Sequence, residues 1–160
     1  MGGGGGWWCF REAGLTIMRP WIPCAALALA LSPLAVIHPV RVSGHSMEPG
    51  LANGRLRWAL RAWAIPPPRR GEVWLVEGPH GSSVKRVLGL PGETLTWQGP
   101  DLWIDGRRID EPWVVHPERG GEGHQACSRG YLVLGDNRPE SQDGRQWGPL
   151  PKAAMRGRIL

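Results

Sequence analysis

The chain has 160 residues, enough for one domain with a modest core once a tail or membrane segment is subtracted. Ten tryptophans and a 41% share of apolar residues argue against a disordered chain, although 24 glycines and 16 prolines indicate many turns. The net charge of +5 comes from scattered Lys and Arg without a nucleic-acid-reading motif, which favours a lipid bilayer and no nucleic acid as partner. The three cysteines form no CxxC pair, so we expect no metal and no cofactor.

Residues 1–20 are an N-terminal tail that we expect to be disordered. The stretch MGGGGGWWCFREAGLTIM is typical of neither a secretory n-region nor a packed element. Met18 is therefore a second candidate for the natural start of the protein.

Residues 21–38 are the expected transmembrane anchor. Trp21–Ile37 carries no charge over 17 residues, the lower limit for crossing a hydrocarbon core of about 30 Å. A cleaved signal peptide and a buried core helix remain as alternatives. Pro23 and Pro33 weaken a helix in all three interpretations.

The charges before this segment predict its orientation. Arg11 and Arg19 precede it, and basic residues favour the cytoplasmic side. We therefore expect a single-pass protein of the plasma membrane, with a cytoplasmic N-terminus and with residues 39–160 on the outer face.

Residues 39–160 predict one mostly-β domain, an antiparallel sheet or partly open barrel. Residues 56–65 come nearest to a helical period, and residues 116–130 predict a mobile polar loop. Asp105 and Gly106 predict a tight hairpin. Period-two alternation between Gly-containing breaks predicts strands within residues 40–44, 72–78, 82–90, 93–99, 102–109 and 130–136.

The segment VSGHSMEPG places Ser46 directly after the apolar run, which raises the question of a nucleophile near a membrane. A serine hydroxyl is a poor nucleophile until a base takes its proton. On an extended chain His45 points to the opposite face from Ser46, and no other histidine has an acidic partner at a recognisable spacing. A Ser-His-Asp triad is therefore disfavoured.

Lys85 is the stronger candidate for the base. Strand alternation puts it on the same face as Ser83 and Val87, with Arg86 turned the other way, so that one charge is aimed inward. Burial that lowered its pKa by about 3 units would cost the ammonium about 4 kcal/mol and leave a neutral amine near pH 7. The alternative is a solvated lysine on an edge strand.

Three segments follow one another in order: SGHSMEPGL at 43–51, VKRVLGLPGE at 84–93 and GDNRPESQDGRQWGPLP at 135–151. They resemble the three sequence boxes of the type I signal peptidases, membrane serine proteases that use a Ser-Lys dyad, and the resemblance covers roughly residues 20–160. In the third box the matching residues are Gly135, Asp136, Asn137, Arg138, Ser141, Asp143, Arg145, Trp147 and Gly148.

The resemblance implies a role for each matching residue. Ser46 would be the nucleophile and Lys85 the general base. Ser141 would bond and orient the lysine, while Asp143 and Arg145 would form an ion pair that braces the loop.

Three glycines depart from the family pattern. Gly50 stands where the family usually has Thr, and Gly144 stands where it often has Ser. Gly44 occupies a position where some members carry a hydroxyl that helps bind the oxyanion. The backbone N–H of Ser46 would therefore carry more of the oxyanion stabilisation.

The resemblance also implies the substrate: the signal peptides of exported preproteins, cut after an Ala-x-Ala-like motif. Residues 39–42 and 82–87 are the expected walls, where an extended peptide adds as a strand. Trp58 and Trp63, with Met47, are expected either to form an apolar rim at the membrane interface or to fill the β core. The expected substrate-binding residues are Pro39, Val40, Val42, Met47 and Val84.

Two other functions are compatible with parts of this pattern. A self-cleaving repressor-type peptidase uses the same dyad, but no DNA-binding helical module fits before Ser46. A non-catalytic anchored β-domain would keep the family shape without activity. The residues do not separate a bacterial from a mitochondrial lineage.

Overall fold

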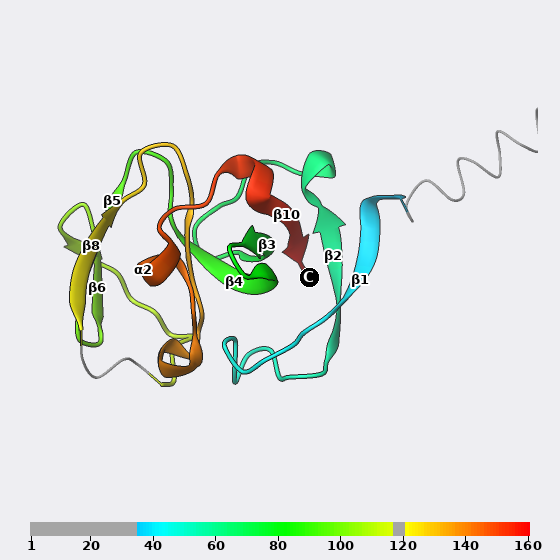
Figure 1. Cartoon of the computed structure of the whole chain (residues 1–160), viewed down its shortest axis with the longest axis horizontal. Coiled ribbons are helices and arrows are strands. Elements are labelled where there is room, and N and C mark those ends of the chain that lie inside the picture. Colours follow the sequence, from blue (N-terminus) through cyan, green and yellow to red (C-terminus); the bar gives the residue numbers. More distant parts are fainter. Residues whose placement is uncertain (1–34, 117–120) are drawn as a thin grey trace, which may run out of the picture. The chain divides into compact units, whose positions relative to one another are not determined.

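The computed structural model describes residues 35–116 and 121–160, which form two antiparallel sheets (Figure 1). These residues belong to the compact unit Pro33–Leu160. The expected tail, and all but the last four residues of the expected anchor, lie outside the described residues. In the part of the chain that the structure covers, no helix is long and apolar enough to cross a membrane.

The larger sheet has six strands in the order β1-β2-β10-β3-β4-β9. All its pairings are antiparallel, and β1 and β9 form its two edges. The strands are β1 (Ile37–Arg41), β2 (Leu56–Arg61), β3 (Val73–Gly78), β4 (Gly81–Gly89), β9 (Leu132–Leu134) and β10 (Met155–Ile159).

The smaller sheet has four strands in the order β7-β6-β5-β8. Its strands are β5 (Thr94–Gln98), β6 (Asp101–Ile104), β7 (Arg107–Arg108) and β8 (Glu122–Ala126). Four short helices complete the described elements: η1 (Ala62–Ala64), η2 (Arg138–Glu140), α2 (Gly144–Trp147) and η3 (Lys152–Ala154). The expectation of a mostly-β antiparallel fold is confirmed.

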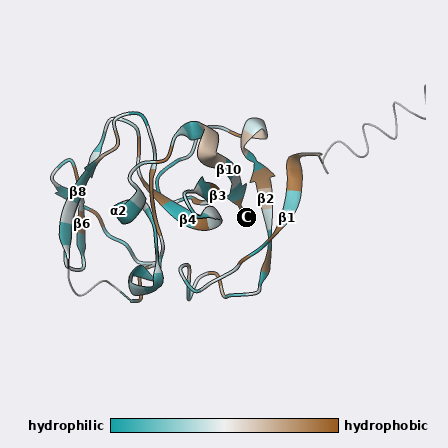
Figure 2. Ribbon diagram, viewed as in Figure 1, coloured by the Kyte–Doolittle hydropathy of each residue, from teal (hydrophilic) through white to brown (hydrophobic). Residues whose placement is uncertain are grey.

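The core consists of two clusters that β4 separates, because successive side chains of a strand point to opposite faces. Val87 packs in the first cluster with Trp74, Val76, Val133 and Met155. Leu88 packs in the second cluster, which joins the two sheets through Leu95, Leu102, Leu132 and Leu134. Apolar residues accordingly follow β4 in Figure 2, where they are brown.

The predicted hairpin is present between β6 and β7. Asp105 and Gly106 both have positive φ angles, 48° and 77°, as a two-residue turn of this kind requires. The segment that came nearest to a helical period, residues 56–65, is mainly the strand β2, followed by the single turn η1. In β2 the alternate residues Arg57, Ala59 and Arg61 share one face, so its arginines fit a two-residue period.

The prediction of a loop over residues 116–130 is wrong for its central part, where β8 pairs with β5 over five residues. Main-chain hydrogen bonds hold β8, and its sequence has no apolar alternation. Gly123 faces Trp97 across the pair, and a Cβ on it would lie 2.4 Å from the indole ring. The glycine that suggested a loop is therefore the residue that lets an aromatic side chain cover the strand.

Gly89 lies where the end of β4 meets the second cluster, and it generates a stability prediction. A Cβ there would lie 2.5 Å from Cys127 Sγ and 2.9 Å from Leu132 Cβ, so the substitution Gly89→Ala overpacks the core. We expect it to lower the free energy of unfolding by about 1–3 kcal/mol, measured by denaturant unfolding. The matched control is Gly50→Ala, whose Cβ would meet no atom closer than 3.7 Å, and we expect it to change stability by less than about 0.5 kcal/mol. Equal effects of the two substitutions would contradict this packing.

Candidate functional site

The site begins with Lys85, which β4 carries on the face of the sheet that holds Val87. Lys85 is only 3% exposed, in agreement with the inward direction that strand alternation predicted for its side chain. Its Nζ donates a hydrogen bond to Ser141 Oγ at 3.2 Å and lies 5.9 Å from the ring centroid of Trp147. The amine is therefore enclosed by an aromatic ring and a single hydroxyl.

Burial is the main influence on Lys85, and it lowers the pKa of the amine because the charged form loses its hydration. The carboxylate of Asp143 opposes this shift, Arg145 adds to it, and Asp136 opposes it more weakly. The net result is a pKa below the ordinary value for lysine, despite the nearby acids.

Asp143 is the centre of the hydrogen-bond network behind Lys85, and it is fully buried. Its Oδ2 accepts from Ser141 Oγ at 2.7 Å and from the Gly135 backbone N–H at 2.9 Å. It also caps the N-terminus of α2, where Gln146 completes a capping box by accepting the N–H of Asp143. One carboxylate thus joins β9, the loop that follows it and the short helix.

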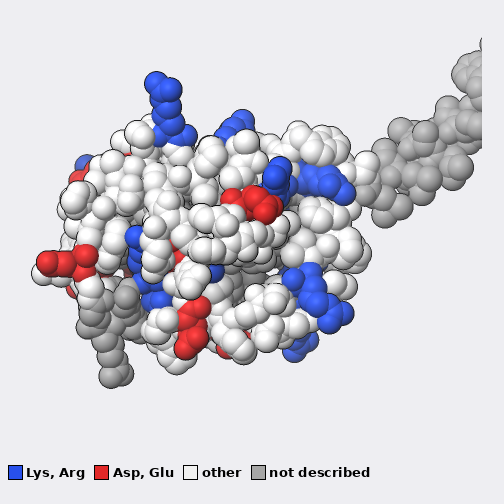
Figure 3. Space-filling view, viewed as in Figure 1, with Lys and Arg blue, Asp and Glu red and all other residues white. Residues whose placement is uncertain are grey.

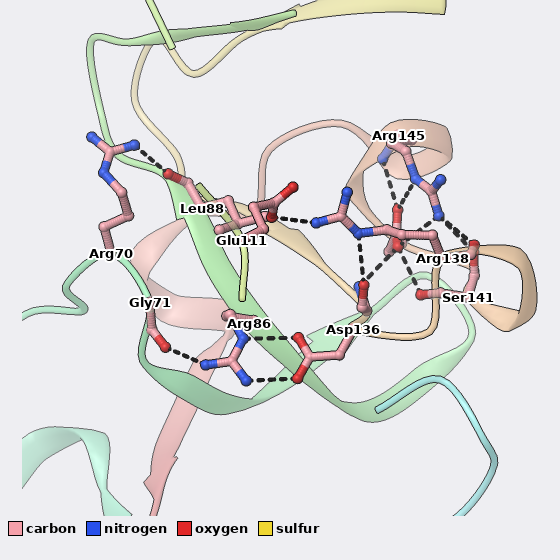
Figure 4. Close-up of polar contacts among 11 residues, drawn as sticks. Arg70, Gly71, Arg86, Leu88, Glu111, Asp136, Arg138, Ser141 and Arg145 are labelled. Atoms are coloured by element: carbon pink, nitrogen blue, oxygen red, sulfur yellow. Dashed lines mark hydrogen bonds and ion pairs between the residues drawn. The ribbon is translucent and has the colours of Figure 1, made fainter. Parts of the chain in front are cut away.

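Arg145 braces the same loop from the other side (Figure 4). Its Nε donates to Asp143 Oδ1 at 2.9 Å, and its Nη2 donates to Asp143 Oδ2 at 3.1 Å. The same Nη2 donates to the carbonyl oxygens of Arg138 and Ser141 at 2.9 and 3.3 Å. The ion pair between Asp143 and Arg145, expected from the resemblance, is present in the structure.

Ser46 reaches this network through its backbone. The backbone N–H of Asn137 donates to the Ser46 carbonyl at 2.9 Å, and Asn137 Nδ2 donates to the His45 carbonyl at 3.1 Å. Gly135 permits the approach, because a Cβ on it would lie 2.6 Å from the Ser46 carbonyl oxygen and 2.3 Å from Ser141 Oγ. The serine loop and the lysine's hydroxyl partner therefore meet at one glycine.

Ser46 and Lys85 come together indirectly in this structure. Within residues 35–116 and 121–160, no hydrogen bond joins Ser46 Oγ to Lys85 Nζ. The connection passes through Ser141, which bonds the amine, and through Gly135, which contacts both serines. The Ser46 residue is half-buried.

His45 is not arranged to serve Ser46. Its ring is exposed, and its Nδ1 pairs with Glu48 Oε1 at 3.0 Å. No histidine bonds Ser46 in the described ranges, and these ranges contain no cluster of His, Cys, Asp or Glu suited to a metal ion. Cys127 is buried as a free thiol in the second core cluster.

The sequence did not predict three contacts made by residues of the third box, namely those of Asn137, Asp136 and Arg138. Asn137, noted only as part of the pattern, holds the Ser46 loop. Arg86 was expected to turn away from the interior, but its side chain is only 16% exposed and forms a bidentate ion pair with Asp136 at 2.8 and 2.6 Å (Figure 4). Arg138 pairs with Glu111, and both side chains are buried. The sequence signal for these contacts was the acidic Asp136 in the third box together with the adjacent basic residues Lys85 and Arg86 in the second.

The three glycines that depart from the family pattern have different causes here. At Gly144 a Cβ would lie 2.8 Å from Leu132 Cδ1 and from the Val133 carbonyl oxygen, so this packing requires glycine. Gly44 has a φ of +91°, a conformation that L side chains rarely adopt. Gly50 has ordinary contacts, so a larger residue would fit there without a shift of the backbone.

The expected substrate walls lie at two unpaired strand edges. β1 pairs only with β2, and β9 pairs only with the part of β4 from Arg86 to Gly89. The half of β4 before Arg86 therefore has an open edge on that side, within the described part of the chain. Among the expected pocket residues, Pro39 is exposed and Val40 half-buried, whereas Val42 and Val84 are 3% and 9% exposed.

The expected apolar rim needs one correction. Met47 is only 1% exposed and cannot contribute to a rim, because its side chain is enclosed by the protein. Trp58 and Trp63 are 53% and 71% exposed, so neither fills the β core. The rim interpretation therefore keeps the two tryptophans and loses the methionine.

Three comparisons with known proteins agree with this arrangement. A sequence profile described as "Signal peptidase, peptidase S26" matches residues 15–160. A probable signal peptidase I-2 from Synechocystis sp. is 32% identical over 130 residues, 74% of this chain and 59% of that protein. Signal peptidase I S from Bacillus subtilis is 30% identical over 141 residues, 78% of this chain and 77% of that protein.

A solved structure has a similar fold. The crystal structure of a signal peptidase I from Enterococcus faecalis is 28% identical, with a TM-score of 0.51. The alignment covers 60% of this chain and 98% of that one. The β-rich part of the chain therefore has the architecture of that enzyme.

The network around Lys85 predicts the direction in which its pKa moves. Asp143→Asn removes the carboxylate that favours the ammonium, so we expect the pKa of Lys85 to fall further below the ordinary value of about 10.4. Because the chain has only two lysines, NMR titration of 13Cε-labelled lysine yields two signals, from Lys85 and the exposed Lys152. Asp101→Asn, which removes the exposed partner of Arg108, is the control and should leave the Lys85 midpoint unchanged. A rise of the midpoint in Asp143→Asn would overturn the assignment of the network.

Proposed function

The chain belongs to the signal peptidase family, peptidase S26, and is a serine peptidase of the hydrolase class; from this premise we propose that it removes signal peptides from exported preproteins with a Ser46/Lys85 dyad. The observation that carries the proposal is the buried amine of Lys85, hydrogen-bonded to Ser141 beside the Ser46 loop. The family model describes signal peptidases, and the sequence relatives and the solved structure are signal peptidase I enzymes.

The hydrogen bonds around Ser141 support a base role for Lys85. The Ser141 hydroxyl donates its hydrogen bond to Asp143, so towards the lysine its oxygen can only accept a hydrogen bond. A neutral Lys85 would then spend one N–H on Ser141 and keep its lone pair for another group. In this proposal the hydroxyl of Ser46, whose backbone carbonyl lies next to Gly135, supplies that proton.

The reaction follows from this assignment. The amine takes the Ser46 proton, and Ser46 Oγ attacks the carbonyl carbon of the scissile peptide bond. Collapse of the tetrahedral intermediate breaks the C–N bond, and the lysine returns the proton to the departing amine. The same amine then activates water, which hydrolyses the acyl-enzyme and frees Ser46.

The developing oxyanion needs hydrogen-bond donors, and the backbone of the serine loop supplies the candidate. The Ser46 N–H has no acceptor among the described residues, so it is available to the substrate oxygen. Gly44 brings no side-chain donor, and its own N–H is occupied by Asn53 Oδ1 at 3.1 Å. Oxyanion stabilisation therefore rests on the Ser46 amide in this proposal.

The substrate would bind as an added strand between the open edges of β1 and β4. Its main chain would pair with residues 39–42 and 82–85, while alternate side chains enter pockets formed by Val40, Val42 and Val84. Met47 would contribute the buried floor of the serine loop. Such pockets favour small residues, which leads to the Ala-x-Ala preference.

Membrane attachment completes the proposal. Residues 21–38 would anchor the chain with its N-terminus in the cytoplasm, after a tail at residues 1–20. The β-rich domain, residues 39–160, would then act on the outer face of the plasma membrane. Anchoring enzyme and substrate in one plane raises their effective concentration at the point where a signal peptide leaves the bilayer.

The dyad is tested by removing each of its members in the full chain. Ser46→Ala removes the nucleophile and Lys85→Met removes the base, so each should lower the rate of preprotein cleavage by about 10⁴-fold or more while the protein stays folded. Gel analysis of a purified preprotein and circular dichroism supply the two measurements. Ser128→Ala and Arg129→Met, both at exposed positions, should cleave at the wild-type rate. Turnover near wild type in the Lys85 variant would refute the dyad, and an inactive wild type would favour a non-catalytic domain.

The pocket geometry predicts which substrate residues matter. In a bound strand the first and third residues before the cut share one face, and the second points the other way. Replacing either outer alanine of an Ala-x-Ala substrate by Phe should lower kcat/KM by about 100-fold, whereas Phe at the middle position should have little effect. Fluorogenic peptides that differ at one position provide the measurement. Equal losses at all three positions would contradict the two-wall arrangement.

A further inference from the structure

A cavity of about 830 Å³ lies apart from the candidate active site, where β1, β2 and β3 meet η1 and η3. Residues of the Ser46, Lys85 and Ser141 network do not line it. Leu75, which lines it, follows Trp74 along β3, and Trp74 pairs with Lys85 and shares its face of the sheet. Leu75 therefore faces the opposite side of β3 from the amine, whereas Met155, which also lines the cavity, belongs to the first core cluster.

The cavity is basic. Arg61, Lys152 and Arg156 contribute to its lining, and Figure 3 shows Lys and Arg side chains (blue) at the end of the molecule where β2 and β10 lie. Arg156 has one distant acidic neighbour, Glu77, at 3.8 Å. Within residues 35–116 and 121–160, neither Arg61 nor Lys152 has an acidic partner. The cavity thus carries positive charge that the protein does not neutralise.

His38 adds an unsatisfied polar group to this basic lining. Its Nδ1 is buried and has no hydrogen-bond partner. The imidazole packs over Gly157, where a Cβ would lie 3.4 Å from His38 Cε1. A buried polar atom without a partner among the described residues is costly, and a ligand with a hydrogen-bonding group would satisfy it.

The position of the cavity along the chain indicates what the ligand is. His38 directly follows Ile37, the last residue of the uncharged run that we propose as the anchor. Trp63, also part of the lining, is 71% exposed. Tryptophan is favoured at the level of lipid headgroups, so the cavity would face that layer.

We propose that this cavity binds the phosphate of an anionic phospholipid headgroup. Arg61, Lys152 and Arg156 would neutralise the phosphate. His38 would form a hydrogen bond with one phosphate oxygen or with the rest of the headgroup. Trp63 would lie at the interface between the headgroups and the acyl chains. The inference rests on the proposed membrane anchor but not on the Ser46/Lys85 chemistry.

The test measures lipid binding by the full chain in uncharged detergent, using native mass spectrometry. We expect one phosphatidylglycerol molecule to bind in preference to phosphatidylcholine. The double variant Arg61→Gln/Lys152→Gln should bind phosphatidylglycerol about 30-fold more weakly, because each cation near a lipid surface contributes about one factor of five. The control Arg107→Gln/Arg129→Gln removes the same charge from exposed positions in another part of the chain and should change affinity less than about twofold.

Two competition experiments distinguish the sources of an anion. Inorganic phosphate and an acidic octapeptide are each added to the lipid-bound protein, and neither should displace phosphatidylglycerol at millimolar concentration. Displacement by phosphate would indicate a site for free anions, displacement by the peptide would indicate a substrate subsite, and either result would overturn the lipid assignment. Equal losses in the double variant and its control would overturn it as well.

The same variants separate this inference from the proposed function. Thermal unfolding monitors their fold, and cleavage of a soluble Ala-x-Ala peptide in detergent monitors the dyad. Lost lipid selectivity with unchanged peptide cleavage would support a headgroup site that is independent of catalysis. If the wild-type protein did not cleave the peptide but still bound phosphatidylglycerol selectively, the dyad would be rejected and the assignment of the cavity would stand.

Discussion

The enclosed amine of Lys85 is the constraint on which the rest of the site depends. A lysine at 3% exposure is unfavourable as an ammonium unless its surroundings compensate, and here they compensate only in part. Asp143 lies one hydroxyl away from the amine, and its charge is shared with Arg145, Gly135 and the start of α2. The carboxylate is thus engaged by other donors and orients Ser141 without contacting the amine directly. A direct ion pair would favour the charged form of Lys85, which could not act as the proposed base.

The fold positions this network by using both faces of one strand. β4 directs Lys85 to one face and Arg86 to the other, and the loop after β9 meets both of them. Asp136 holds Arg86, while Ser141 holds Lys85, so two successive basic residues of one motif bind two residues of another. Gly135 and Asn137, on either side of Asp136, contact the Ser46 loop. The three sequence boxes are therefore one connected structure.

Local pattern was sufficient for the parts of the fold that local physics controls. Strand alternation placed Lys85 in the interior, and the steric freedom of Asp105 and Gly106 located a hairpin. The strand β8 was missed because its pairing partner, 24 to 32 residues away in sequence, supplies its hydrogen bonds. The clamp of Asn137 on the Ser46 loop and the burial of Met47 likewise depend on contacts between distant segments. The identity of the boxes came from the family resemblance, because turn-forming residues alone do not specify a network.

The open edges of β1 and β4 have a consequence for the unoccupied protein. Unpaired strand edges can pair with another copy of the chain, and confinement to a membrane, as proposed above, would promote such self-association. Several features disfavour this self-association: β1 is short and contains Pro39 and the charged Arg41, and β4 carries the polar Ser82 at its open edge. These edges therefore combine unpaired main-chain groups, which the proposed substrate strand would use, with residues that disfavour pairing between copies of the chain.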